Sequence, residues 1–202
     1  MNLPSILGSI GTMIDLIRST PQLARLIRAR KAFGVSVDAT GTSCVVSLGW
    51  LAYGIITDQP FVTLASGIIA ASFFIITLIA LRLGRSINEF RVTPAWLGVL
   101  LVSGIFFGKV GLGLALSISA LISNFPQVRV AYKEEDLSGL SLGTWLLNLS
   151  AGLIWGGYAL LQHDLTIIAA SFFQTTTSTI IIALKIFKPS VNTSSLHEVT
   201  AE

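Results

Sequence analysis

Long apolar stretches recur along the 202 residues, and short segments between them hold nearly all the charged side chains. A helix that crosses a bilayer needs about 20 mostly apolar residues. The pattern predicts seven such helices, near residues 4–28, 36–57, 60–82, 94–108, 110–132, 140–161 and 164–187. The stretch 95–131 is too long for one crossing, so we place a break at Gly108-Lys-Val-Gly111. The polar tail, residues 189–202, is predicted to be disordered.

Composition supports this all-α, polytopic membrane prediction and excludes several classes of protein. Hydrophobic residues make up 52% of the chain and charged residues 11%, with a mean hydropathy of +0.79. Soluble domains are about a quarter charged. The single Cys44 excludes a disulfide framework, and His163 and His197 have no metal-ligand spacing. No nucleophile–base constellation or phosphate loop is present, so we predict no enzyme, no metal and no cofactor.

The basic residues predict the orientation of the helices. All but two of the 13 lysines and arginines fall at the same end of the predicted bundle. They are Arg25, Arg28, Arg30, Lys31, Arg82, Arg85, Arg91, Arg129, Lys133, Lys185 and Lys188. The positive-inside rule places this end in the cytoplasm, with the N-terminus outside and the C-terminus inside. This topology accounts for the net charge of +3 without a nucleic-acid partner.

An internal repeat appears when the chain is shifted against itself by 105 residues. The shift aligns rare residue types without a gap: Pro21-Gln22 with Pro126-Gln127, Gly34-x-Ser36 with Gly139-x-Ser141, Trp50-x-x-Tyr53 with Trp155-x-x-Tyr158, and Ala65-Ser66 with Ala170-Ser171. Each repeat crosses the membrane three times, so one extra helix between them keeps the copies parallel. We predict a 3+1+3 arrangement: repeats 1–85 and 110–188, a linker 86–109 with the fourth helix, and a cytoplasmic tail 189–202. Parallel repeats of this kind place a substrate site between the halves.

This pattern resembles the PQ-loop/MtN3 clan, which includes the SWEET and SemiSWEET sugar transporters and lysosomal amino-acid exporters. The resemblance covers about residues 3–187 and rests on Pro-Gln, Gly-x-Ser and Trp-x-x-Tyr in register in both repeats. The SWEET pattern has Pro-Asn where this chain has Ala65-Ser66 and Ala170-Ser171. It has proline where this chain has Ser36 and Ser141. The resemblance implies a transporter that works by alternating access, and these departures bear on the solute rather than on the fold.

Polar and aromatic residues at membrane depth are the candidates for a substrate site. Trp50 and Trp155 lie about 12 Å of helix from the outer loops, deeper than an interfacial tryptophan usually lies. They are either pocket walls or packed in the core. With them we expect substrate contacts from Ser47, Ser66, Asn148 and Ser171. The three serines among these rest on the resemblance. Tyr53 and Tyr158, one turn nearer the outside, are either an outer gate or interfacial residues.

Two prolines and two charges complete the candidate set. Pro21 and Pro126, followed by Gln22 and Gln127, interrupt their helices and act either as paired hinges at the cytoplasmic mouth or as static kinks. Asp15 and Arg18 lie three residues apart on one helix face. They form either a mutual ion pair or, with Asp15 as a proton or charge relay, part of a coupled pathway. Neither recurs in the second repeat.

The sequence therefore predicts a transporter of a small polar solute, a sugar, in the plasma membrane. Its partners are the solute and the lipid bilayer, and self-association is left open. The alternatives are a proton-coupled amino-acid transporter, or a receptor or scaffold on the same fold.

Serines 36 and 141 are predicted to cap the helices that follow them.

Overall fold

The computed structural model describes residues 2–29, 36–133, 137 and 140–188, and within them the chain is all helical. The elements are α1 (Leu3–Ala29), α2 (Val37–Ile56), α3 (Pro60–Arg82), the 3-10 segment η1 (Ile87–Glu89), α4 (Val92–Lys133), α5 (Leu142–Gln162) and α6 (Leu165–Phe187). Helices α2 to α6 are each long and apolar enough to cross a membrane. The all-α membrane fold is thus confirmed; the number of crossings and their direction stay predictions. The predicted tail lies outside the described residues.

Helix α4 is broken at the position where the sequence predicts a break. Its 42 residues would extend about 63 Å if straight, twice the thickness of a bilayer core. Gly108 has φ 58° and ψ −148°, a conformation that residues with a side chain rarely adopt. The glycine therefore divides α4 into a first arm, residues 92–107, and a second arm, residues 109–133.

The helices of the two halves pack in the same order. In the first half, α3 lies between α1 and α2; in the second, α6 lies between α5 and α4. The close approaches match as well. A Cβ atom added to Gly8 would collide with Phe61, and one added to Gly113 would collide with Thr166. Both residues of the second pair lie 105 positions after those of the first. Helix α1 packs on α5 and α2 packs on α4, so the contacts between the halves repeat too.

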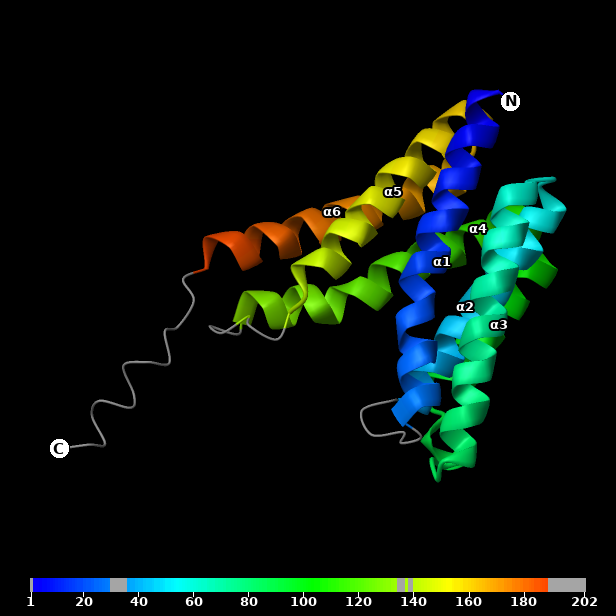
Figure 1. Ribbon diagram of the computed structural model, residues 1–202. Coiled ribbons are helices and arrows are strands. Elements are labelled where there is room, and N and C mark those ends of the chain that lie inside the picture. Colours follow the sequence, from blue (N-terminus) through cyan, green and yellow to red (C-terminus); the bar gives the residue numbers. More distant parts are fainter. Residues whose placement is uncertain (1, 30–35, 134–136, 138–139, 189–202) are drawn as a thin grey trace.

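The two halves diverge from a common end. Figure 1 shows α1 to α3 side by side, while α5, α6 and the second arm of α4 lean away from them toward the end that carries the C-terminus. The halves approach each other where α1 begins and α5 ends. The bundle therefore has one narrow end and one wide end, and the wide end is the one predicted to be cytoplasmic.

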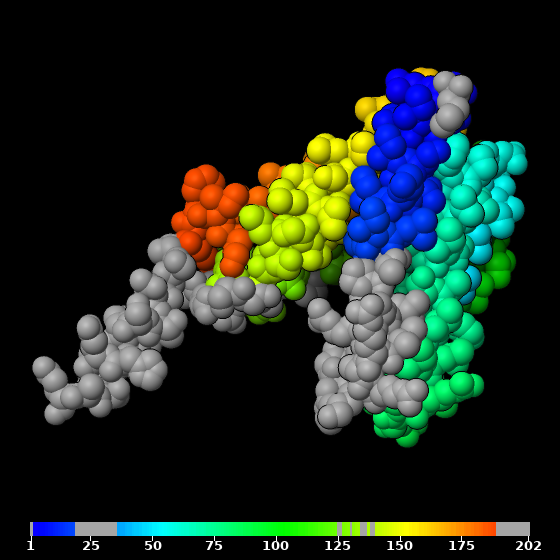
Figure 2. All heavy atoms as spheres, viewed as in Figure 1, coloured from blue at the N-terminus to red at the C-terminus, as the bar shows by residue number. Residues whose placement is uncertain are grey.

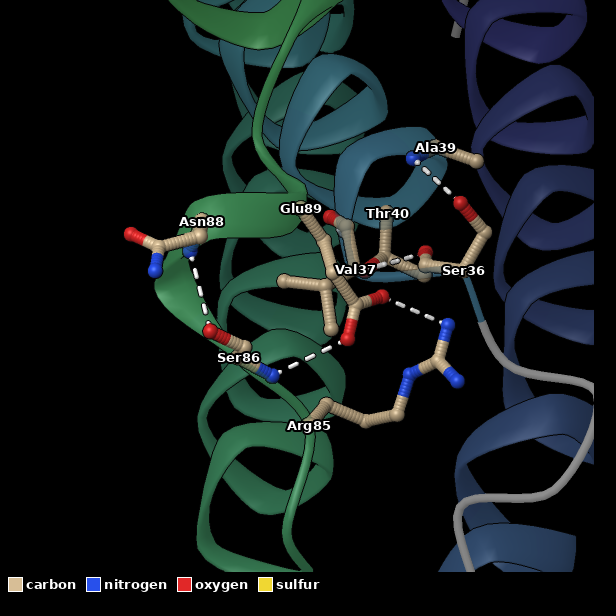
Figure 3. A network of polar contacts seen from close by, with 8 residues as sticks. All are labelled: Ser36, Val37, Ala39, Thr40, Arg85, Ser86, Asn88 and Glu89. Atoms are coloured by element: carbon tan, nitrogen blue, oxygen red, sulfur yellow. Dashed lines mark hydrogen bonds and ion pairs between the residues drawn. The ribbon is translucent and has the colours of Figure 1, made fainter.

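The serine caps predicted from the sequence are confirmed. The Oγ atoms of Ser36 and Ser141 accept hydrogen bonds from the backbone N–H groups of Ala39 and Thr144, at 3.2 and 3.4 Å. Figure 3 shows the first cap beside η1, where the carboxylate of Glu89 accepts from the Ser86 N–H and pairs with Arg85 at 2.6 Å. The loop glycines, Gly34 and Gly139, lie outside the described residues.

Asp38 fixes the start of α4 to the start of α2. Its carboxylate accepts hydrogen bonds from the backbone N–H groups of Arg91, Val92 and Thr93, at 2.9 to 3.0 Å. The Thr93 hydroxyl also bonds this carboxylate and lies 3.0 Å from the Thr42 hydroxyl. The sequence indicates only that an acid suits the first turn of α2. The structure shows that Asp38 also caps the first turn of α4, which attaches the first arm to the first half.

One packing prediction follows from the closest approach of α2 to α3. A Cβ atom on Gly54 would lie 2.8 Å from the backbone nitrogen of Thr63, so the α3 backbone would have to move. We expect Gly54→Ala to lower the free energy of unfolding by about 1–3 kcal/mol, the usual effect of overpacking. Thermal unfolding of the purified protein in detergent measures it.

The matched control is Gly98→Ala in α4, where an added Cβ meets nothing within 4 Å. This change should be neutral or slightly stabilising, because alanine favours a helix over glycine by about 0.5–1 kcal/mol. Equal melting temperatures for the two variants would contradict the packing argument.

Candidate functional site

A cavity of about 800 Å³ lies between the two halves. It begins at the wide end, beside Ser36, Asp38 and Val92, and reaches Trp50, about 21 Å further along α2. Figure 2 shows the second half leaning away from the first toward the wide end. The polar and aromatic side chains that line it are Asp15, Arg18, Ser36, Asp38, Thr42, Ser43, Ser47, Trp50, Ser66, Phe73, Ser123, Trp155, Ser171 and Gln174.

Five of the six predicted substrate-contact residues line this cavity. They are Ser47, Trp50, Ser66, Trp155 and Ser171. Asn148 is not among the lining residues, but it forms hydrogen bonds with two residues that line the cavity, Arg18 and Gln174. Its Oδ1 accepts a hydrogen bond from Arg18 at 2.8 Å, and its backbone carbonyl accepts one from Gln174 at 3.0 Å. Contact of these residues with a substrate stays a prediction.

A polar network joins α1 to α5 across the wall of the cavity. The indole N–H of Trp155 donates to Oδ2 of Asp15 at 2.9 Å, and Nη2 of Arg18 lies 2.9 Å from Oδ1 of the same carboxylate. Arg18 continues the chain to Asn148 through Nη1. The ion pair considered from the sequence is thus present, and Asp15 is buried, with 6% of its surface exposed. A relay role for Asp15 stays a prediction.

The opposite wall has the same positions but not the same chemistry. Shifted by 105 residues, Asp15 becomes Ala120 and Arg18 becomes Ser123, and both line the cavity. Trp155 corresponds to Trp50 and Asn148 to Ser43, which also line it. Among the described residues, no side chain accepts a hydrogen bond from the Trp50 indole N–H. The two walls therefore share several equivalent positions, but only the α1–α5 wall carries the charged pair.

The two tryptophans have the same aromatic neighbour in each half. Trp50 and Tyr53 pack edge to face with ring centroids 5.7 Å apart, and Trp155 and Tyr158 pack in the same way at 5.4 Å. Neither tyrosine lines the cavity, and Tyr158 is fully buried. Both rings lie beyond the tryptophans at the narrow end. The gate role stays a prediction, but the tyrosines are core residues rather than interfacial ones.

At the narrow end, Asp164 forms a cluster of hydrogen bonds that joins the halves. Its carboxylate accepts hydrogen bonds from the Tyr53 hydroxyl at 2.9 and 3.0 Å and from Nε2 of Gln59 at 2.5 Å. It also caps α6 by accepting from the Ile167 N–H at 3.0 Å. Gln59 and Asp164 are 105 residues apart, so two equivalent positions of the repeat touch. Equivalent positions can meet only near the axis that relates the halves, so this cluster lies on that axis.

The predicted hinges lie within helices. The backbones of Pro21 and Gln22 belong to α1, and those of Pro126 and Gln127 belong to the second arm of α4. Gln127 is half-buried. The side chains of Pro21, Gln22 and Pro126 lie outside the described part of the structure. The hinge role stays a prediction.

Sequence reasoning missed several polar residues of the cavity, and one signal could have found two of them. Ser43 and Ser123 are the repeat counterparts of Asn148 and Arg18, so the shift of 105 residues points to both. Thr42 and Asp38 carry no such signal. The described residues contain no group of histidine, cysteine, aspartate and glutamate side chains that could hold a metal ion.

Fold and cavity together define the class: an integral membrane protein in which two similar sets of helices enclose a central cavity. The sequence matches the PQ loop repeat over residues 110–168, inside the segment predicted as the second repeat. The solved structure of a eukaryotic SWEET transporter superimposes on the chain with a TM-score of 0.71 and 16% identity, over 93% of this chain and 99% of that one. No curated protein matches the sequence. Residues 110–168 thus resemble a PQ loop repeat, and the chain has the fold of that SWEET transporter, as the sequence motifs indicate.

Proposed function

We propose that this protein is a membrane transporter that moves a small polar solute, a sugar, by alternating access. The observation that carries the proposal is the cavity of about 800 Å³, large enough for one small solute, between two halves with matching helix order. The solved structure with the same fold is described as a transporter. Facilitated diffusion across the plasma membrane follows as the simplest form of this activity.

The two ends of the cavity support alternating access. At the narrow end, the contacts of Asp164 with Tyr53 and Gln59 separate the cavity from the outside. At the wide end, Ser36 and Asp38 lie at the rim. A state closed on one side and open on the other is what a rocking mechanism requires. We infer that the structure represents the inward-open state, in which Pro21 and Pro126 would act as hinges.

The side chains of the cavity favour a hydroxylated ring as the solute. Trp50 and Trp155 offer flat apolar faces, and Ser47, Ser66 and Ser171 offer hydroxyl groups that both donate and accept. Binding sites of this kind combine apolar walls with a few placed polar groups. A sugar has both an apolar face and a ring of hydroxyls.

Counterflow in proteoliposomes tests the proposal. Vesicles loaded with unlabelled D-glucose should transiently accumulate labelled D-glucose from outside, without a pH gradient and above the level of empty liposomes. Exchange that appears only with a pH gradient would favour the proton-coupled alternative. Absence of exchange for every sugar tested, together with a co-purifying protein, would favour a receptor or scaffold.

A further inference from the structure

The ion pair of the cavity presents its positive partner to the solute. Both residues line the cavity, but only 8% of the Asp15 side chain is exposed. The side chain of Arg18 is 33% exposed and lines the cavity. The pair is neutral as a whole, but the guanidinium is the more exposed of the two partners and offers more of its surface to a solute.

Arg18 is held in place and still has donors to offer. A guanidinium has five N–H donors in a fixed plane. Nη1 donates a hydrogen bond to Asn148, and Nη2 lies 2.9 Å from Oδ1 of Asp15 in an ion pair. The other donors have no partner among the described residues. Because two contacts already fix the plane, a ligand would bind without ordering a flexible side chain.

No matching site for a cation is present on the described walls. Oδ2 of Asp15 accepts a hydrogen bond from Trp155, and Oδ1 is buried beside the Arg18 guanidinium, with which it forms an ion pair. Asp38, the other acid of the lining, accepts hydrogen bonds from three backbone N–H groups at the start of α4. An ammonium group would have to compete with these partners, whereas a carboxylate needs only the donors that Arg18 has left.

From this geometry we infer that the cavity binds a carboxylate on Arg18 and that the preferred solute is a sugar acid, a hydroxylated ring with one carboxylate. This inference rests on the proposed transport function and specifies its substrate class. The ring lies against Trp50 and Trp155, as a neutral sugar would. The carboxylate lies on the α1–α5 wall, because the equivalent positions on the other wall, Ala120 and Ser123, carry no charge.

A pair of sugars that differ in one group tests the inference. D-Glucuronate replaces the terminal hydroxymethyl group of D-glucose with a carboxylate. With the full-length protein, we expect D-glucuronate to bind about tenfold or more tightly than D-glucose by calorimetry, the usual scale of a charge-assisted hydrogen bond. Counterflow in proteoliposomes should show the same order, with glycine as the zwitterionic comparison.

The variants are chosen so that the protein still folds. Arg18→Gln alone would leave Asp15 as an unpaired buried charge, so the test uses Asp15→Asn together with Arg18→Gln. The asparagine can still accept from Trp155. This double variant should bind D-glucuronate and D-glucose within about twofold of each other. Arg18→Lys keeps the positive charge but loses the planar guanidinium, so it should lose part of the preference for D-glucuronate over D-glucose. Arg129→Gln, which removes an exposed arginine of α4, should keep the full preference for D-glucuronate.

Other results would contradict either the carboxylate site or the transport function, and the two cases can be told apart. If D-glucose is exchanged and D-glucuronate is not preferred, or if glycine is preferred, the inference is wrong and transport stands. If the preference survives in the double variant, Arg18 is not the carboxylate site. If none of the three solutes is exchanged, the proposed sugar transport fails and the inference fails with it.

Discussion

Replacing Trp155 with alanine should reduce solute exchange in proteoliposomes at least tenfold while the protein remains folded. The substitution removes one of the two aromatic walls and also the indole N–H that binds Asp15. A stacked aromatic contact contributes about 1–3 kcal/mol in comparable ring-binding sites, and a factor of ten corresponds to 1.4 kcal/mol. Counterflow measures the effect, and a melting curve in detergent confirms the fold.

Two variants separate the roles of this side chain. Trp155→Phe keeps an aromatic wall but loses the hydrogen bond, so it should retain more exchange than Trp155→Ala. Leu153→Ala, on the same helix with 59% of the leucine exposed, should leave exchange unchanged. Wild-type exchange by a folded Trp155→Ala protein would remove Trp155 from the substrate site.

Replacing Asp164 with alanine should open the narrow end of the molecule. The change removes the carboxylate that accepts from the Tyr53 hydroxyl and removes one of the two acceptors of the Gln59 amide, which keeps Thr57. It also removes the cap of α6. A lost cap costs about 0.5–2 kcal/mol and each buried unsatisfied group about 1–3 kcal/mol. We expect the closed arrangement to lose about 2–4 kcal/mol, which shifts the population toward the outward-open state.

Labelling from outside reports the shift. In a Cys44→Ala background, which removes the only native cysteine, Ser66→Cys places a thiol in the cavity. An impermeant maleimide applied from the side of the narrow end should label this thiol at least tenfold faster when Asp164 is alanine. Asp58 is an exposed acid at the same end, and Asp58→Asn should barely change the labelling rate. Equal labelling rates with and without Asp164 would mean that this cluster does not close the cavity.

The helices were predictable because hydrocarbon imposes a strict pattern. A spanning segment must satisfy its own backbone and be apolar for about 20 residues, so each span is visible in the sequence. The break at Gly108 was predictable too, because a 42-residue helix is too long for one crossing. The caps at Ser36 and Ser141 are local, since each depends on a hydroxyl and an N–H three residues later.

The contacts of the cavity were only partly predictable. Distance from the outer loops located Trp50 and Trp155, and the resemblance pointed to Ser66 and Ser171; all four line the cavity. Neither could assign the partner of Trp155, since Asp15 lies 140 residues away on another helix. The orientation of each helix about its axis decides such a contact, and side-chain packing sets that orientation rather than hydropathy.

By itself, the sequence determined that this chain is a helical membrane protein with little charge inside the membrane, and it predicted two related halves. It also identified Asp15 and Arg18 as the charges within a predicted span. Only the tertiary structure decided what they do there: Asp15 is buried against Trp155, and Arg18 lines the cavity, held by Asn148. The tertiary structure also places the Gln59 amide in hydrogen-bond contact with Asp164, near the axis that relates the two halves. Both arrangements join residues more than 100 positions apart, so they exist only once the two halves have packed together.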